Sequence, residues 1–318
     1  MNDWDIIGHD WAVRRLKSAI EQEGLAQSHL FVGLPSVGKM TLASAVARAL
    51  LGHDARTRTL VAQRKHPDVS IVEPEGDAIK VDQVRALLHT LTLAPVESRH
   101  RVAIIDQAHL MSDGGKNAIL KTLEEPNPSV VMILTAPTID AVLPTISSRC
   151  QVMNLRPVSI GDIEKALAQR GVDAGRATFI ARLSRGRVGW ALRATSNDDL
   201  LAARAEHLND LRGLLNANRT QRFAYAEKLA RKEGDQIAMV LNDWLLLWRD
   251  VTNTRSKPLN DDQRDLITGL ASALGPAQSA EVMRMLSNTL HHLDKNVNAR
   301  LALDVLLLRM PYVKIAEV

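Results

Sequence analysis

The sequence of 318 residues has one cysteine, few aromatic residues and no long apolar run. Because Cys150 is the only cysteine, an intramolecular disulfide and a cysteine-rich zinc site are excluded. No stretch has the roughly 20 consecutive apolar residues that a membrane-spanning helix needs, and the amino terminus does not read as a signal peptide. These absences predict a cytoplasmic protein with no membrane partner.

The composition is otherwise that of a globular chain. Apolar residues make up 46% of the sequence and charged residues 24%, and the length predicts two or three domains. Leu and Ala are abundant while aromatics are only 3%, which favours helices. The formal net charge of +4 permits contact with nucleic acid but does not demand it.

The first half of the chain alternates strand-like and helix-like segments. Apolar runs predict strands at residues 28–33, 69–75, 101–107, 129–137 and near 151–157. Between them, the patterns predict helices at residues 39–51, 79–93 (entered after Asp82), 114–126 (stopped by Pro126) and shortly after Pro144. Continuous apolar strands separated by helices are typical of a parallel sheet covered on both faces.

After Pro157 the strand signal disappears and amphipathic helices take over. We therefore expect three domains: an α/β domain with a parallel sheet at residues 1–155, a small helical lid at 156–197, and an all-α domain at 198–318. Trp244 and Trp248 in the last domain are four residues apart, so both rings lie on one helix face. Two interpretations stay open for them, the domain's own core or contact with a neighbouring subunit.

The stretch GLPSVGKM contains most of a phosphate-binding loop, with Gly33, Gly38 and Lys39 at the spacing G-x4-G-K. A strand, a glycine-rich turn and a helix cradle phosphates with backbone N–H groups, and the lysine reaches the outer phosphates. The hydroxyl residue that would normally hold magnesium is replaced by Met40. Thr41 is a candidate nucleotide contact but is displaced by about 100° around the helix. Nucleotide binding is plausible on this pattern, whereas a catalytic metal is not expected.

The second element of a nucleotide site is an apolar strand that ends in an acid, and VAIIDQ supplies it with Asp106. Hydrolytic relatives of such loops place a glutamate next, but Gln107 stands there. An amide cannot act as a general base near neutral pH, although a glutamine can orient a water.

Arg149, in LPTISSRCQ, follows a short helix and precedes a strand. It reads either as a solvated surface charge or as an arginine finger that reaches the γ-phosphate held by a neighbouring subunit. The histidines show no metal-ligand spacing and are predicted to be solvated or in the core; those considered are His29, His66, His109, His291 and His292.

Together, the segments NAILKTLEEPNPSVVMILT, LPTISSRCQ and RVAIIDQAHLM resemble the clamp-loader branch of the AAA+ family, and within it the delta-prime subunits of bacterial DNA polymerase III. The resemblance continues in IIGHDWAVRRLKSAIEQEGLAQSHLFVG, HPDVSIVEPE and NVNARLALDVLLLRM, and so covers nearly the whole chain. It implies an AAA+ domain, a lid and a carboxyl-terminal helical collar that assembles five subunits into an open ring.

The resemblance also implies partners and roles. The partners are clamp-loader subunits of the gamma/tau and delta types, the sliding clamp indirectly, and primed DNA within the complex. Lys39 matches the phosphate-loop lysine, Asp106 the metal-binding acid and Thr135 the sensor at the end of the fourth strand. Arg149 matches the finger that acts in trans. A further pair, Ile7 and Gly8, falls where the family contacts adenine.

Three departures from the motor subunits of this family accumulate in one site. Met40 and Gln107 replace catalytic residues, and Gly189 stands where motor subunits place the sensing arginine of the lid. The four cysteines of the family's zinc module are also absent from GHDARTRTLVAQRK, so no zinc is expected. ATP or ADP can still occupy the loop. Such losses characterise the stator subunit, a non-hydrolytic member of the DNA polymerase III holoenzyme.

Two rival interpretations remain. One is a self-sufficient AAA+ ATPase, either a motor clamp-loader subunit or a helicase loader, which would hydrolyse ATP alone. The other is a nucleotide-binding scaffold in which Arg149 has no function. The sequence does not decide whether nucleotide is bound, whether the chain touches DNA directly, which motor partners it has, or its oligomeric state when isolated.

Overall fold

The computed structural model describes residues 4–52, 54–295 and 297–314. The chain divides into two compact units, one extending to Leu192 and the other beginning at Arg193. The strands are β1 (Ser28–Val32), β2 (Val69–Val72), β3 (Arg101–Ile105), β4 (Val130–Ala136) and β5 (Gln151–Asn154). The helices of the first unit are α1 (Asp10–Glu21), α2 (Lys39–Leu51), α3 (Ala55–Ala62), α4 (Val81–Leu91), α5 (Asp113–Glu124), α6 (Pro144–Ser147), α7 (Ile160–Ala168), α8 (Ala174–Ser184) and α9 (Val188–Ser196), whose last residues cross the division.

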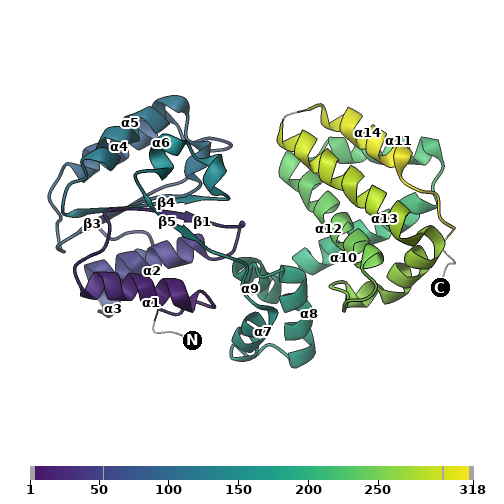
Figure 1. Ribbon diagram of the computed structural model, residues 1–318, viewed down its shortest axis with the longest axis horizontal. Coiled ribbons are helices and arrows are strands. Elements are labelled where there is room, and N and C mark those ends of the chain that lie inside the picture. Colours follow the sequence, from purple (N-terminus) through teal and green to yellow (C-terminus); the bar gives the residue numbers. More distant parts are fainter. Residues whose placement is uncertain (1–3, 53, 296, 315–318) are drawn as a thin grey trace. The chain divides into compact units, whose positions relative to one another are not determined.

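The strands form a five-stranded sheet in the order β2-β3-β4-β1-β5, and every pairing is parallel. Helices α1 and α2 lie on one face of this sheet and α4 and α5 on the other (Figure 1). Successive side chains of a strand point to opposite faces. Leu30 and Val32 therefore join the core under α4 and α5, while Phe31 joins the core under α1 and α2. The predicted parallel sheet covered on both faces is confirmed.

Two predicted helix ends need correction. Helix α4 starts at Val81, ahead of the predicted position after Asp82, because the Gln83 side chain accepts the Lys80 N–H at 2.8 Å and so completes the first turn. Helix α5 ends at Glu124, since a residue before proline, here Glu125, is disfavoured in helical geometry.

Helix α3 was not predicted. It lies in the segment GHDARTRTLVAQRK, for which the sequence analysis notes only the absence of cysteines. The cap at the start of the helix explains why a helix forms there. The Asp54 carboxylate accepts the Thr57 N–H at 2.9 Å and the Thr57 hydroxyl at 2.6 Å, which satisfies an amide at the start of the helix.

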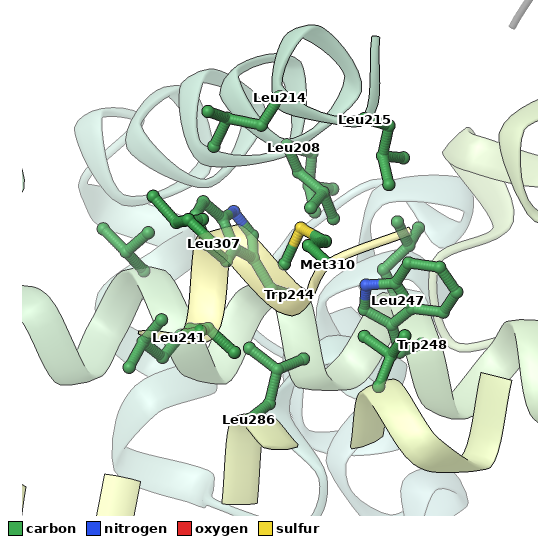
Figure 2. Close-up of a cluster of buried hydrophobic side chains, with 14 of the residues drawn as sticks. Leu208, Leu214, Leu215, Leu241, Trp244, Leu247, Trp248, Leu286, Leu307 and Met310 are labelled. Carbon is green, nitrogen blue, oxygen red and sulfur yellow. The ribbon is translucent and has the colours of Figure 1, made fainter. Parts of the chain in front are cut away.

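The second unit contains α10 (Asp199–Leu215), α11 (Arg219–Ala230), α12 (Gly234–Thr252), α13 (Arg264–Asp294) and α14 (Ala299–Arg309), with a kink in α13 at Gly275 and Pro276. Trp244 and Trp248 are fully buried in its core (Figure 2). The Trp244 indole N–H donates to the His207 carbonyl oxygen of α10 at 2.7 Å. Of the two interpretations left open for these rings, the domain's own core is correct. Within the described residues, no helix combines the length and the apolar character that crossing a bilayer requires.

His29 gives the first unit a pH-dependent stability. Its side chain is completely buried in β1, and burial lowers its pKa from 6.5 to about 4. Between pH 6.5 and pH 4, His29 is therefore protonated in the unfolded chain but not in the folded chain. The free energy of unfolding consequently decreases as the pH falls through this range. The difference corresponds to about 3 kcal/mol.

We expect the His29→Phe variant to lose much less stability than the parent between pH 7 and pH 4, measured by urea unfolding at each pH. The exposed His89, changed to Phe, is the matched control and should keep the parent's pH dependence. An unchanged profile for His29→Phe would contradict the assignment.

Candidate functional site

The order of the strands brings the predicted nucleotide residues together. β4 lies between β1 and β3, and the carboxyl ends of parallel strands meet at one edge of the sheet. The phosphate loop follows β1, Asp106 follows β3, and Thr135 lies near the end of β4, where it pairs with Phe31 of β1. Residues that are far apart in sequence therefore share one edge.

The phosphate loop requires glycine at two positions. Gly33 has a φ of 154°, and a Cβ atom there would approach the Leu155 carbonyl oxygen to 2.4 Å. Gly38 has a φ of 116° and caps α2, whose first residue is Lys39. The loop is therefore followed directly by the amino terminus of α2. Backbone N–H groups and the helix dipole at such a terminus favour the binding of phosphate.

The Lys39 ammonium is turned onto its own loop. Its Nζ donates to the carbonyl oxygens of Gly33 at 2.6 Å and Leu34 at 3.1 Å. Burial lowers the pKa of Lys39, and the negative charge of Asp106 opposes that shift. The ammonium is thus held by two carbonyl oxygens of the loop, close enough to Asp106 to be affected by its charge.

Asp106 is held by the predicted sensor residue. The Thr135 hydroxyl donates to Asp106 Oδ1 at 2.5 Å and accepts the Gln107 N–H at 3.0 Å. Thr135 is completely buried, whereas the Gln107 side chain is exposed and its backbone is left-handed, with a φ of 53°. Asp106 and Thr135 therefore fix each other, and the residue that follows Asp106 carries an amide, which cannot accept a proton from water near neutral pH.

Neither residue after Lys39 supplies a well-placed hydroxyl. Met40 packs against the core between α1, α2 and the sheet, and Thr41 is exposed one position further around the helix. The groups present fit a phosphate, because the glycine turn, helix terminus and lysine remain. They do not fit a magnesium-dependent hydrolytic site, and we derive no catalytic step through bound nucleotide in this chain.

The start of α9, which belongs to the predicted lid, is hydrogen-bonded directly to the phosphate loop. The Gly189 N–H at the start of α9 donates to the Ser36 carbonyl oxygen at 2.8 Å. A Cβ atom at Gly189 would lie 3.2 Å from that oxygen. A glycine here allows an approach that a sensing arginine would disturb, and this contact was not apparent from the sequence.

Ile7 and Gly8, predicted to contact adenine, lie beside the same loop. His9 follows them and its Nε2 is 3.0 Å from the Val37 carbonyl oxygen. Gly8 has a φ of 69°, and a Cβ atom there would meet Val158 Cγ1 at 2.7 Å. His9 therefore contacts the phosphate loop, Gly8 lies close to Val158, and Ile7 is buried.

His109 lies near enough to Lys39 and Asp106 to be affected by their charges, which the sequence did not reveal. Burial lowers its pKa, the charge of Lys39 lowers it further, and the charge of Asp106 opposes both. His109 is therefore a neutral ring within electrostatic reach of the lysine and the acid at neutral pH. Its position two residues beyond Gln107, in the short turn after β3, could have suggested this.

Arg149 is not among the residues gathered around Lys39 and Asp106; it follows α6, and 34% of its side chain is exposed. Its guanidinium contacts Glu124, as described below. Cys150, the next residue, packs against the core under α4 and α5, and burial raises the pKa of its thiol to about 12. The arginine is thus exposed, while the next residue anchors the backbone in the core.

Within the described residues, no group of three or more His, Cys, Asp and Glu side chains is arranged to hold a metal ion.

Comparison with known proteins finds similar subunits of DNA polymerase III. A family model described as DNA polymerase III, delta subunit, matches residues 8–159. The DNA polymerase III subunit delta′ of Bacillus subtilis is 28% identical over 250 residues, which cover 75% of each chain. The DNA polymerase III subunit gamma of Buchnera aphidicola subsp. Acyrthosiphon pisum is 30% identical over 171 residues, covering 51% of this chain and 47% of that protein.

This chain therefore spans three quarters of the delta′ relative and about half of the gamma relative. Among solved structures, a gamma subunit-related protein of Thermotoga maritima is 18% identical, with coverage of 92% of this chain and 97% of that one and a TM-score of 0.44.

The parallel sheet carries the phosphate loop after β1 and the hydrogen-bonded pair of Asp106 and Thr135. The sequence that forms it matches the delta family model and the delta′ and gamma subunits. The expected resemblance is confirmed: by sequence, this chain is similar to DNA polymerase III subunits of the delta, delta′ and gamma types, the clamp-loader relatives that its motifs indicate.

Proposed function

We propose that this chain is the delta-prime-like stator of a bacterial clamp loader, which helps to place the sliding clamp on primed DNA. In this role Arg149 acts in trans on ATP held by an adjacent gamma/tau-type subunit. The observation that carries the proposal is a contrast within one chain. Arg149 is exposed, whereas the chain's own pocket has Met40 and Gln107 in place of the hydrolytic groups.

The rival interpretation as a self-sufficient motor is less well supported. Met40 is committed to the core, Gln107 offers an amide where a general base is needed, and Gly189 leaves no sensing arginine above the loop. All three would have to be compensated by other groups. ATP or ADP bound by Lys39, Thr41, Asp106 and Thr135, with adenine against Ile7 and Gly8, remains part of the proposal as a structural ligand.

The proposed organisation follows the same plan. Residues 1–155 form the AAA+ domain, 156–197 the lid and 198–318 the collar that joins the subunits. The partners are gamma/tau-type and delta-type subunits, with clamp and primed DNA met within the assembly. We place this complex in the cytoplasm, with no membrane contact and no zinc.

An apolar stripe on α14 supports assembly through the collar. Leu301, Val305 and Leu308 are 61%, 44% and 42% exposed, and their spacing of four and three residues places them on one face of the helix. Contiguous exposed apolar surface of this kind marks protein contact sites.

The proposal is tested by capture. Tagged full-length chain, expressed in its native cell, should co-purify gamma/tau-type and delta-type subunits. The double variant Leu301→Lys, Leu308→Lys should lose at least about ten-fold of that captured material, because two charges would be desolvated in the contact. Met239→Lys, at another exposed apolar residue on α12, is the matched control.

Capture of no clamp-loader subunit by the parent chain would contradict the proposed function. If the α14 variant captures as much of the clamp-loader subunits as the parent does, the proposed function stands. That result would contradict only the proposal that the apolar stripe on α14 contacts another subunit.

A further inference from the structure

The guanidinium of Arg149 is already bound inside its own chain. Its Nη2 donates to Glu124 Oε1 at 2.5 Å, and its Nη1 donates to the Thr145 carbonyl oxygen at 2.8 Å and the Ser148 hydroxyl at 3.4 Å. Glu124 is the last residue of α5, and Thr145 and Ser148 belong to α6 and its carboxyl end. Two helices from different parts of the sequence therefore fix one side chain.

Stability alone does not account for this ion pair. The Glu124 and Arg149 side chains are 50% and 34% exposed, and ion pairs in such surroundings contribute little to folding. The consequence for the arginine itself is larger. A free arginine side chain has many rotamers, and this conformational entropy is lost when the side chain binds a phosphate.

Arg149 still has N–H donors with which it could bind a phosphate. A guanidinium has five N–H donors, and the three contacts above engage three of them, so two are left for an incoming oxygen. The contacts therefore hold the group in place and still leave it able to meet a phosphate.

We propose that Glu124 is a positioning residue for Arg149, which holds the guanidinium in the conformation that meets the phosphate of nucleotide bound by the adjacent subunit. This inference rests on the proposed function of Arg149 in trans. Without the carboxylate, the arginine must be ordered anew for each turnover, so the rate of the chemical step falls while ATP binding by the neighbour is unaffected.

The chain supplies its own matched control. Glu125 is the next residue, is also exposed, and has the same charge. In the part of the chain that the structure describes, its carboxylate takes part in no hydrogen bond or ion pair with another side chain. Any effect of charge alone on the assembly or on DNA should therefore be shared by Glu124→Gln and Glu125→Gln, whereas positioning of Arg149 is lost only in the first.

The test uses the complete clamp loader reconstituted with full-length variants of this chain, and measures ATP hydrolysis stimulated by clamp and primed DNA. Glu124→Gln should lower kcat about ten-fold and leave KM for ATP unchanged, while Glu125→Gln matches the parent. In a chain that already carries Arg149→Ala, adding Glu124→Gln should have no further effect.

The outcomes separate the two claims. If Arg149→Ala lowers kcat and Glu124→Gln does not, the positioning role is wrong and the trans arginine stands. A further loss from Glu124→Gln in the Arg149→Ala background also overturns the positioning role, because the carboxylate would then act independently. If Arg149→Ala itself has no effect, the proposed function fails and this inference fails with it.

Discussion

Replacing Arg149 with alanine is expected to slow hydrolysis about 10³-fold at the ATP site that borders this chain in the assembled loader. An arginine finger stabilises the charge that develops on the transferred phosphoryl group, and its loss costs about 10³–10⁵ in rate. The measurement is single-turnover hydrolysis of ATP by the reconstituted complex with clamp and primed DNA. Arg149→Lys should be nearly as slow, because an ammonium lacks the planar fork.

Arg156→Ala is the control for this experiment, since Arg156 is also exposed and lies just beyond β5. It should hydrolyse ATP at the parent's rate. Hydrolysis by the Arg149→Ala complex at the rate of the parent would favour the scaffold interpretation, in which this arginine has no function.

Replacing Arg222 with methionine is expected to destabilise the second unit by about 4 kcal/mol. Arg222 is buried in α11 and donates to four carbonyl oxygens: Leu214 at 3.1 Å, Leu307 at 2.9 Å, Met310 at 2.5 Å and Pro311 at 3.0 Å. These oxygens lie at the carboxyl ends of α10 and α14. In the variant, each of them would lose the charged donor that Arg222 supplies. Each unsatisfied buried acceptor costs about 1–3 kcal/mol, part of which is recovered by relaxation and water.

The measurement is urea unfolding followed by tryptophan emission, to which the buried Trp244 and Trp248 of this unit contribute. Arg219→Met, at an exposed arginine of the same helix, should unfold within about 0.5 kcal/mol of the parent. An Arg222→Met chain as stable as that control would show that the four carbonyl oxygens are satisfied in another way.

The sequence predicted the regular parts of the fold well because the local signals there are strong. The bounds of α2 agree with the prediction, since Gly38 and Gly52 flank an uninterrupted helical pattern. Helix α3 has no apolar periodicity of that strength, and its start depends on the Asp54 cap. The kink at Gly275 and the anchoring of Arg222 depend on tertiary contacts, which a single sequence does not reveal.

The site shows the same division. The residue types and spacing around Lys39, Asp106 and Thr135 were enough to predict that they belong together, and the strand order does bring Thr135 to Asp106. Contacts between segments far apart in the sequence could not be predicted. Neither the bond from Gly189 to Ser36 nor the pairing of Arg149 with Glu124, 25 residues earlier in the chain, has a sequence signature.

The central claim is that this chain acts on a neighbour's nucleotide and does not hydrolyse its own. Phosphate release from ATP by the purified chain alone, with magnesium present, tests it most directly. We predict a rate equal to the protein-free blank, for the parent and for Lys39→Ala alike. Magnesium-dependent turnover of about 1 per second or faster, abolished by Lys39→Ala, would contradict the account.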